Sequence, residues 1–239
     1  MSKRFILFIV EGINDEKEIA AILGSSYFDK YRDKYVPYIY PVHEDITSSV
    51  KITDKNIQKK LNDILQDFRR KGVPFSNIRI SDIQEIVQIT DLDGCFVPDE
   101  NVIRSDDPTF IYTDEAIITS NVAGACGRNK KKTGILFKLL DVKQIANIPY
   151  SIYYVSCNME HLLFDIRTVS KDKKRELADG FQEKCKDDPT YLEQSVFKKG
   201  ICSNCSYDES WDEMLRECES LKRHTNFNLF FSDNAKNKK

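Results

Sequence analysis

The chain has 239 residues, of which 36 are Lys or Arg and 38 are Asp or Glu, so its formal net charge is −2. Because the two signs nearly cancel, the composition argues against a protein that holds nucleic acid or anionic lipid through bulk charge, but it leaves room for a local basic patch. The length is sufficient for one domain with a substantial core, or for one domain with a small appendage.

The first apolar run, Phe5 to Val10, bears on membrane association and export. It is too short to span a bilayer, and Glu11 follows it in place of a cleavage site. We therefore expect neither a signal peptide nor a membrane anchor. Seven cysteines, an odd number without an export signal, favour reduced thiols and a cytoplasmic protein.

Strand-like and helix-like segments alternate through the first two thirds of the chain. Apolar and aromatic composition predicts strands at 5–10, 35–42, 83–90 and 150–155, and a short strand pair within 109–120. Apolar periodicity and capping residues predict helices at 14–23 and 57–71, around 135–140 and around Glu160. We expect only helices after Lys171, at 171–185, 190–197, 209–222 and 225–231. This order predicts an α/β sheet domain with helices packed over or beside it.

Acidic residues follow three of the predicted strands. Glu11 ends the first strand, Asp91 and Asp93 end the strand at 83–90, and Glu160 comes shortly after the strand at 150–155. In an open α/β sheet, ligands bind beyond the carboxyl ends of the strands. If these strands are parallel neighbours, four carboxylates from separate parts of the sequence meet in one crevice.

Carboxylates that lie close together repel one another unless a cation neutralises them. Oxygen ligands suit a hard cation such as Mg²⁺ or Mn²⁺. In an extended segment, Asp91 and Asp93 point to the same side, and Gly94 then lets the backbone turn close to a ligand. A divalent ion held in this way commonly serves phosphoryl or phosphodiester chemistry. Each motif taken alone also fits an ordinary turn.

Two of these motifs together resemble the Toprim family. The segment from Phe8 to Asp15, with Glu11-Gly12, looks like its first motif, and Ile89-Thr-Asp91-Leu-Asp93-Gly94 looks like its Asp-x-Asp motif. The resemblance implies a mostly parallel sheet flanked by helices, Mg²⁺ on the Asp-x-Asp pair, and Glu11 as general acid/base or further ligand. Asp15, at the last position of the first motif, is a second candidate metal ligand.

The third acidic site narrows the resemblance. Ser156-Cys-Asn-Met-Glu160-His-Leu-Leu is similar to a later motif of OLD-type and stand-alone Toprim nucleases of phage-defence systems, in which such a Glu completes a two-metal site. Thr225-Asn226-Phe-Asn-Leu-Phe also resembles the closing segment of RloB-like defence proteins. By this resemblance the chain is a Mg²⁺-dependent nuclease with two ions on Glu11, Asp91, Asp93 and Glu160. An ATPase partner would be a separate protein, because the chain has no P-loop.

The resemblance also suggests how the chain is divided. We expect a Toprim-like catalytic domain at 1–168 and a helical C-terminal extension at 169–239 packed on it. Glu11 and Asp91 lie further apart in sequence than in a compact Toprim core, so an insertion or longer helices are expected between about 43 and 82. The sequence leaves open whether the substrate is DNA or RNA, including tRNA, and whether the chain forms a homo-oligomer.

Two other readings share these motifs. A small ribonuclease of RNA maturation shares the first two, but Glu160 and the long tail count against it. A non-catalytic Toprim module that only binds nucleic acid, as in recombination proteins, would keep the fold without needing all four carboxylates. The presence of the full acidic set favours the enzyme.

A basic cluster offers a contact for nucleic acid. Arg128, Lys130, Lys131 and Lys132 lie between a glycine-rich stretch and the helix that we predict to begin near Gly134. A flexible basic loop there would contact the phosphate backbone, although a solvated loop without a ligand has the same composition.

The cysteines raise the question of a structural zinc. Cys202-x-x-Cys205, followed by Cys218 and His224, has ligand-like spacing. Cys218, however, shares an apolar helical stripe with Trp211, and the chain has only one Cys-x-x-Cys. We therefore expect free thiols rather than zinc. None of His43, His161 and His224 shows a nucleophile–base arrangement. A place at the site is open to His161, which is beside Glu160, but we expect it on a helix surface.

Overall fold

The computed structural model describes residues 4–24, 28, 32–49, 51–71, 79–188, 190–192, 196–199 and 205–231. The chain forms two compact units that interleave in sequence. The first contains Met1–Thr90 and Gly134–Tyr153, and the second contains Asp91–Thr133 and Tyr154–Lys239. The boundary expected after residue 168 lies inside the second unit.

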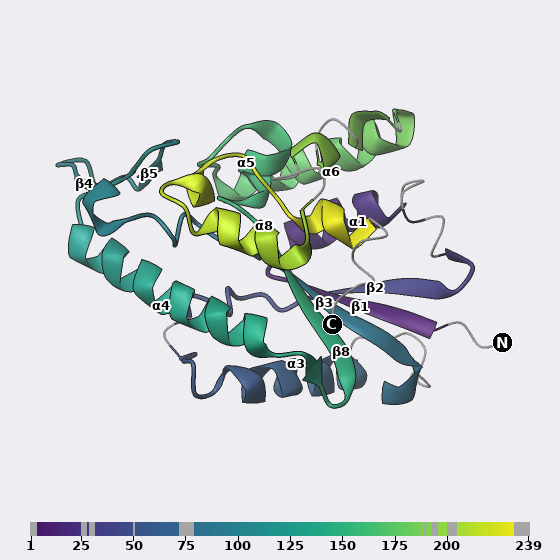
Figure 1. Cartoon of the computed structure of the whole chain (residues 1–239). Coiled ribbons are helices and arrows are strands. Elements are labelled where there is room, and N and C mark those ends of the chain that lie inside the picture. Colours follow the sequence, from purple (N-terminus) through teal and green to yellow (C-terminus); the bar gives the residue numbers. More distant parts are fainter. Residues whose placement is uncertain are drawn as a thin grey trace. The chain divides into compact units, whose positions relative to one another are not determined.

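A five-stranded sheet with the order β2-β1-β3-β8-β7 forms the centre of the first unit (Figure 1). Its strands are β1 Arg4–Val10, β2 Tyr35–Pro41, β3 Ile83–Asp91, β7 Gln144–Ile145 and β8 Ile148–Val155. β1 runs parallel to both β2 and β3, whereas β7 and β8 are antiparallel. This confirms the predicted α/β class with a mostly parallel sheet. β2 lies at the edge, where its two prolines remove the fewest hydrogen bonds.

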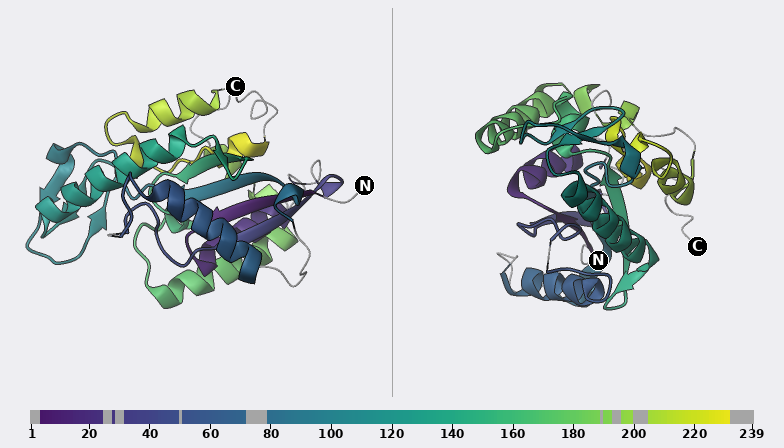
Figure 2. Two further views of the ribbon diagram at one scale, coloured as in Figure 1. Left: turned by 90° about the horizontal axis from the view of Figure 1, so that it is seen from below. Right: turned by 90° about the vertical axis from the view of Figure 1, so that its left-hand side faces the viewer.

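The apolar run in β1 exists because this strand is covered on both faces. All residues from Ile6 to Val10 are buried, as expected for a central parallel strand. Helices α1 (Ile13–Gly24) and α3 (Ile57–Lys71) lie on opposite faces of the sheet (Figures 1 and 2). The apolar positions predicted for α3, from Ile57 to Phe68, are all buried, and the Phe68 ring contacts Tyr38 and Tyr40 of β2.

The glycine-rich basic segment is helical rather than a loop. Helix α4 spans Val122–Asp141, so the prediction that this helix begins near Gly134 is wrong. Asn121 starts it, because its side-chain Oδ1 accepts a hydrogen bond from the backbone N–H of Gly124 at 2.9 Å. Three glycines lower the intrinsic helix propensity, but buried residues such as Ala125 and Lys132 attach the helix to its surroundings.

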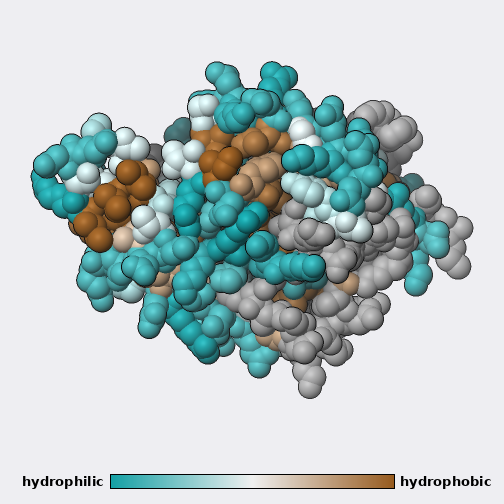
Figure 3. All heavy atoms as spheres, turned by 90° about the horizontal axis from the view of Figure 1, so that it is seen from above, coloured by the Kyte–Doolittle hydropathy of each residue, from teal (hydrophilic) through white to brown (hydrophobic). Residues whose placement is uncertain are grey.

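The second unit contains a small sheet with the order β4-β6-β5 (Val102–Arg104, Ile117–Thr119 and Ile111–Tyr112). β5 and β6 form the antiparallel pair expected within 109–120. The core beneath this sheet joins residues from distant parts of the chain, namely Val97, Val102, Ile117, Ala125, Cys218 and Leu221. Figure 3 shows an apolar patch over the small sheet, whose most exposed apolar residues are Ile103 and Ile111.

The C-terminal helices of the second unit are α5 Met159–Phe164, α6 Lys171–Asp187 and α8 Tyr207–Met214. The helix expected at 209–222 is shorter than predicted, because α8 ends at Met214 and a separate 3₁₀ turn follows at Glu219–Leu221. The helix expected at 190–197 lies partly outside the described residues. The last predicted helix is a 3₁₀ helix at Phe227–Phe231.

The end of the described chain returns to β8 within the second unit. The backbone N–H of Tyr154 donates to Asn226 Oδ1 at 2.8 Å, and the Thr225 hydroxyl donates to the Tyr154 carbonyl at 2.7 Å. The Tyr154 ring also packs edge-on against Trp211 of α8. These contacts fix residues 207–231 to the strand from which the chain continues toward Glu160.

Gly94 provides a stability test of the second unit. Its φ of +66° belongs to the left-handed region, and a Cβ there would lie 2.5 Å from Leu221 Cδ2. We expect Gly94→Ala to lower the free energy of unfolding by about 2–3 kcal/mol. Urea denaturation measures this change. As a control, Gly127→Ala in α4 meets no atom within 4 Å and should raise stability by about 0.5–1 kcal/mol. Equal effects of the two substitutions would contradict this account.

Candidate functional site

Glu11 lies directly after β1 in the first unit, at the carboxyl end of the strand. Its Oε1 accepts a hydrogen bond of 2.8 Å from the hydroxyl of Thr90, near the end of β3. The parallel register, in which Ile9 pairs with Gln88, brings these two strand ends together. Glu11 therefore lies at the end of the first strand, as the sequence predicted, and buried Thr90 orients one of its carboxylate oxygens.

Asp15 has a structural task at the start of α1. Its Oδ2 accepts the backbone N–H of Gly12 at 2.8 Å. The carboxylate thus satisfies one of the backbone donors that a helix leaves unpaired at its first turn, and its charge suits the positive end of the helix dipole. These contacts account for Asp15 without a metal ion.

Asp91 and Asp93 open the second unit with a tight turn. Two hydrogen bonds attach the turn to the end of β8 and to the segment just after it. Leu92 N donates to Val155 O at 2.8 Å, and Asp93 N donates to Cys157 O at 2.9 Å. The φ of Asp93 is +51° and that of Gly94 is +66°. The expectation of an extended Asp-x-Asp segment is therefore wrong at Asp93, whose backbone is left-handed.

A buried lysine neutralises Asp93. The Nζ of Lys132 lies 2.5 Å from Asp93 Oδ2, and the side chain of Lys132 is 0% exposed against 26% for Asp93. An ammonium group enclosed in protein is costly unless a carboxylate pairs with it. Lys132 thus belongs to the interior of the second unit and not to a flexible phosphate-binding loop.

Arg128 lies one helical turn before Lys132 and contacts the same aspartate turn. Its guanidinium donates to the Asp93 carbonyl at 2.9 Å and to the Tyr112 hydroxyl at 2.8 Å, and it lies 4.8 Å from the centre of the Phe110 ring. Burial by itself lowers the pKa of Arg128, but Tyr112 and Asp93 outweigh it and raise the pKa. The guanidinium therefore holds the turn in place as a permanent cation.

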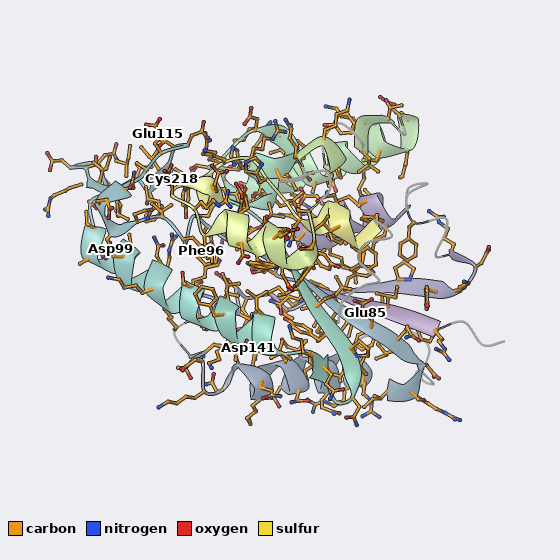
Figure 4. The ribbon with its side chains drawn as sticks, in the orientation of Figure 1. Glu85, Phe96, Asp99, Glu115, Asp141 and Cys218 are labelled. Atoms are coloured by element: carbon orange, nitrogen blue, oxygen red, sulfur yellow. The ribbon has the colours of Figure 1, made fainter. Side chains whose placement is uncertain are left out.

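The other two lysines of the basic cluster lie nearer the surface. Lys130 is exposed and pairs at 2.6 Å with Asp99, which Figure 4 shows beside α4. This pair lowers the pKa of Asp99 and raises that of Lys130, as expected for mutual attraction. Lys131 is half-buried. The four basic residues thus divide into two that face the interior and two that border solvent.

Glu160 lies in the first turn of α5 and is buried. Asn158 caps this helix by accepting the N–H of His161 at 2.8 Å. A carboxylate in the first turn is favoured by the helix dipole. Its main partner is Lys174 of α6, whose Nζ is 2.8 Å from Glu160 Oε1. Glu160 therefore has the same kind of neighbour as Asp93, a lysine from a later helix.

His161 is buried, contrary to the expectation of a surface position. Its Nε2 lies 3.5 Å from Asp165 Oδ1, while Nδ1 has no hydrogen-bond partner among the described residues. Burial, helped by the charge of Arg167, lowers the pKa of His161 to about 4. The imidazole is thus neutral near pH 7 and packs as part of the α5 core.

The described cysteines are mostly inert thiols. Cys95, Cys126, Cys157, Cys185 and Cys218 are free, and burial raises the pKa of Cys95 to about 12. Cys218 lies in the core, as its apolar stripe predicted, and its Sγ donates to the Glu115 carbonyl at 3.1 Å (Figure 4). Cys205 is disulfide-bonded, which differs from the expected free thiol. Cys202 lies outside the described residues, and the zinc question stays a prediction.

The carboxylates fit a hard divalent cation by their donor chemistry, since oxygen ligands suit Mg²⁺ and Mn²⁺. Within the described ranges, however, no group of three or more His, Cys, Asp or Glu side chains is gathered closely enough to hold a metal ion. In the second unit, Asp93 and Glu160 each lie beside a lysine instead. A metal ion would therefore have to compete with an ammonium group for each of these two carboxylates.

Sequence reasoning missed both lysine–carboxylate pairs. A signal for the first was present, because Arg128 and Lys132 are four residues apart and face the same side of a helix. The glycines hid this signal by suggesting a loop. Lys174 offered no comparable signal, since Lys171, Lys173 and Arg175 surround it in a basic run that reads as a solvated helix face.

Comparison with protein-family models, with curated proteins and with solved structures finds no match for this chain. Its function must therefore be argued from its own residues. None of the helices in the described part of the chain is long and apolar enough to cross a membrane.

The Lys132–Asp93 pair predicts a specific loss of stability. Lys132→Met keeps the apolar stem but leaves Asp93 without its counter-charge, so we expect a loss of about 2–3 kcal/mol. Adding Asp93→Asn should recover part of that loss, because the unpaired charge disappears. Urea denaturation of the single and double variants measures both effects. The matched control Lys130→Met breaks an exposed pair in the same helix and should change stability far less than Lys132→Met does. A silent Lys132→Met variant would contradict the interior role of this lysine.

His161 predicts a loss of stability in mild acid. Well above pH 6.5 the imidazole is neutral in both states, and as the pH falls toward 4 the unfolded chain takes up the proton first. The folded state therefore loses up to about 1.4 kcal/mol per pH unit in this window. Denaturation curves between pH 7 and 4 should show a shallower pH dependence in His161→Leu than in the wild type. An equal pH dependence in the wild type and in His161→Leu would contradict this account.

Proposed function

We propose that this chain is a metal-dependent nuclease that hydrolyses phosphodiester bonds in DNA or RNA. The first two acidic motifs resemble those of Toprim nucleases, and the segment around Glu160 resembles a later motif of OLD-type members. By the same resemblance, its biological role would be defence against phage, with any ATPase partner supplied by another protein.

The observation that carries the proposal is the arrangement of two parallel strand ends. Glu11 follows β1, Thr90 stands near the end of the neighbouring β3, and the two side chains share a hydrogen bond of 2.8 Å. The next residue after Thr90 is Asp91, the first of the Asp-x-Asp motif. Ligands of open α/β sheets bind at this edge. The hydrogen bond between Glu11 and Thr90, which connects the first motif to the residue before Asp91, supports the proposal.

The chain's own residues have definite tasks under this proposal. Thr90 fixes one oxygen of Glu11, so this carboxylate is oriented to take up or deliver a proton at the reacting water. Asp91, Asp93 and Glu160 would hold Mg²⁺ or Mn²⁺, two ions by the resemblance, with Asp15 as a further candidate. When bound, such ions supply Lewis-acid stabilisation of charge on the phosphate oxygens.

The contacts within the basic cluster reduce the number of its residues that we propose as nucleic-acid contacts. Arg128 and Lys132 are engaged with the Asp93 turn inside the second unit. Lys130 and Lys131 border solvent on the same helix, although Lys130 already contacts Asp99. We propose Lys130 and Lys131 as the contacts to phosphate, because a weak exposed pair is readily exchanged for a nucleic-acid phosphate.

A non-catalytic nucleic-acid-binding module is the second candidate, and a specific observation favours it. Asp93 and Glu160 each have a lysine counter-ion from the same chain. If these pairs are permanent, the two carboxylates maintain the fold and need no metal ion. The module and the nuclease therefore differ in whether divalent ions bind and whether cleavage follows.

A cleavage assay tests the nuclease. The purified chain is incubated with plasmid, single-stranded DNA, total RNA and tRNA in the presence of Mg²⁺, Mn²⁺ or EDTA. We expect cleavage that requires the metal and falls by at least about 10³-fold in both Glu11→Gln and Asp91→Asn, as for the loss of a central catalytic group. The matched control is Asp141→Asn at the end of α4, which should cleave like the wild type.

The outcomes separate the candidates. Cleavage that persists in EDTA, or that survives both substitutions, would overturn the proposed mechanism. Binding of a nucleic acid without cleavage under any condition would favour the module instead. The substrate panel also decides between DNA and RNA.

A further inference from the structure

The two lysine-paired carboxylates of the second unit, Asp93 and Glu160, differ in how far the lysine beside each one can move. Lys132, beside Asp93, is fully enclosed. Lys174, beside Glu160, has a side chain that is 36% exposed, whereas Glu160 itself is only 3% exposed. A lysine at the border of solvent can move its ammonium into water on its flexible four-carbon stem. An enclosed lysine has no such alternative.

A buried carboxylate needs a counter-charge, and either an ammonium group or a metal ion can supply it. As a whole residue, Glu160 is only 2% exposed, and a buried charge is costly unless an opposite charge or hydrogen bonds accompany it. Lys174 supplies that charge at 2.8 Å from Oε1. A divalent ion bound to the same carboxylate would lie close to the ammonium group, and two positive charges at such short range repel strongly in a water-poor environment. Lys174 and a metal ion are therefore alternative occupants of the same position.

We propose that Lys174 is an autoinhibitory counter-ion that occupies Glu160 in the metal-free protein and must swing into solvent before a divalent cation binds there. This inference rests on the proposed function, because only the role of Glu160 as a metal ligand makes the lysine a competitor. The measured affinity for metal is then lower than the intrinsic affinity of the carboxylates, by the cost of breaking the Lys174–Glu160 pair.

The neighbouring residue Lys173 provides a matched control. It lies on the same turn of α6 and carries the same charge, but it pairs with Glu176, and both of these side chains are exposed. Lys173→Met therefore removes one positive charge near the site without touching Glu160. Any general electrostatic gain in cation affinity appears in both variants, and the competition appears only in Lys174→Met.

Isothermal titration of the full chain with Mn²⁺ at about 0.15 M salt, where long-range charge effects are screened, tests the proposal. Lys174→Met should bind Mn²⁺ about five- to tenfold more tightly than the wild type, the factor that corresponds to a partly exposed ion pair. Lys173→Met should stay within about twofold of the wild type. Lys174→Arg keeps the competing charge and should bind no more tightly than the wild type. Should Lys174→Met fail to fold, Lys174→Gln replaces it.

The outcomes distinguish this inference from the proposed function. If Glu160→Gln weakens Mn²⁺ binding but Lys174→Met binds no more tightly than Lys173→Met, the counter-ion role is overturned and the metal site stands. If neither the wild type nor any variant binds Mn²⁺, the metal-dependent function is overturned and this inference with it. Tight binding in Lys174→Met together with weak binding in the wild type supports the inference directly, without reference to cleavage.

Discussion

A charged side chain that is withdrawn from water requires an opposite charge beside it, and the second unit contains two such pairs, Lys132 with Asp93 and Glu160 with Lys174. Asp93 receives the charge from Lys132 of α4, and Glu160 receives it from Lys174 of α6. Each pair joins a residue that follows a strand to a helix later in the chain. Removing one partner would leave an uncompensated buried charge, which costs more than the pair contributes. The positions of α4 and α6 are therefore tied to the two carboxylates.

Helix α4 shows how tertiary contacts override local propensity. Its sequence contains glycines and a run of four basic residues, a composition that by itself favours a loop. One face of the helix carries Arg128 and Lys132, which both contact Asp93. Because the two residues are four positions apart, only a helical backbone brings both side chains to the same side. Arg128 also lies over Phe110 from the segment before β5. The charges that suggested a solvated loop are what attach the helix to the protein.

The sequence predicted the elements whose signal is local and missed those set by distant contacts. The apolar run of β1 and the apolar periodicity of α3 are local signals, so these two elements were predicted nearly to their ends. By contrast, Gly94 lies directly against Leu221, which is far away in sequence and belongs to the core of the second unit. The burial of His161 has the same origin, since helix periodicity does not say which face another segment will cover.

The candidate site was predicted as a set of equivalent carboxylates, and the structure makes them inequivalent. Glu11 is oriented by a neutral hydroxyl, Asp93 by an enclosed ammonium and Glu160 by an ammonium at the border of solvent. A divalent ion would meet an enclosed ammonium group beside Asp93 and an ammonium group at the border of solvent beside Glu160. Sequence alone gives all three residues the same chemistry, because the distinction lies in the partner and its exposure. The near-neutral charge balance argues against general attraction to nucleic acid. Under the proposed function, a phosphate would therefore be bound through local exchange of cations at these carboxylates.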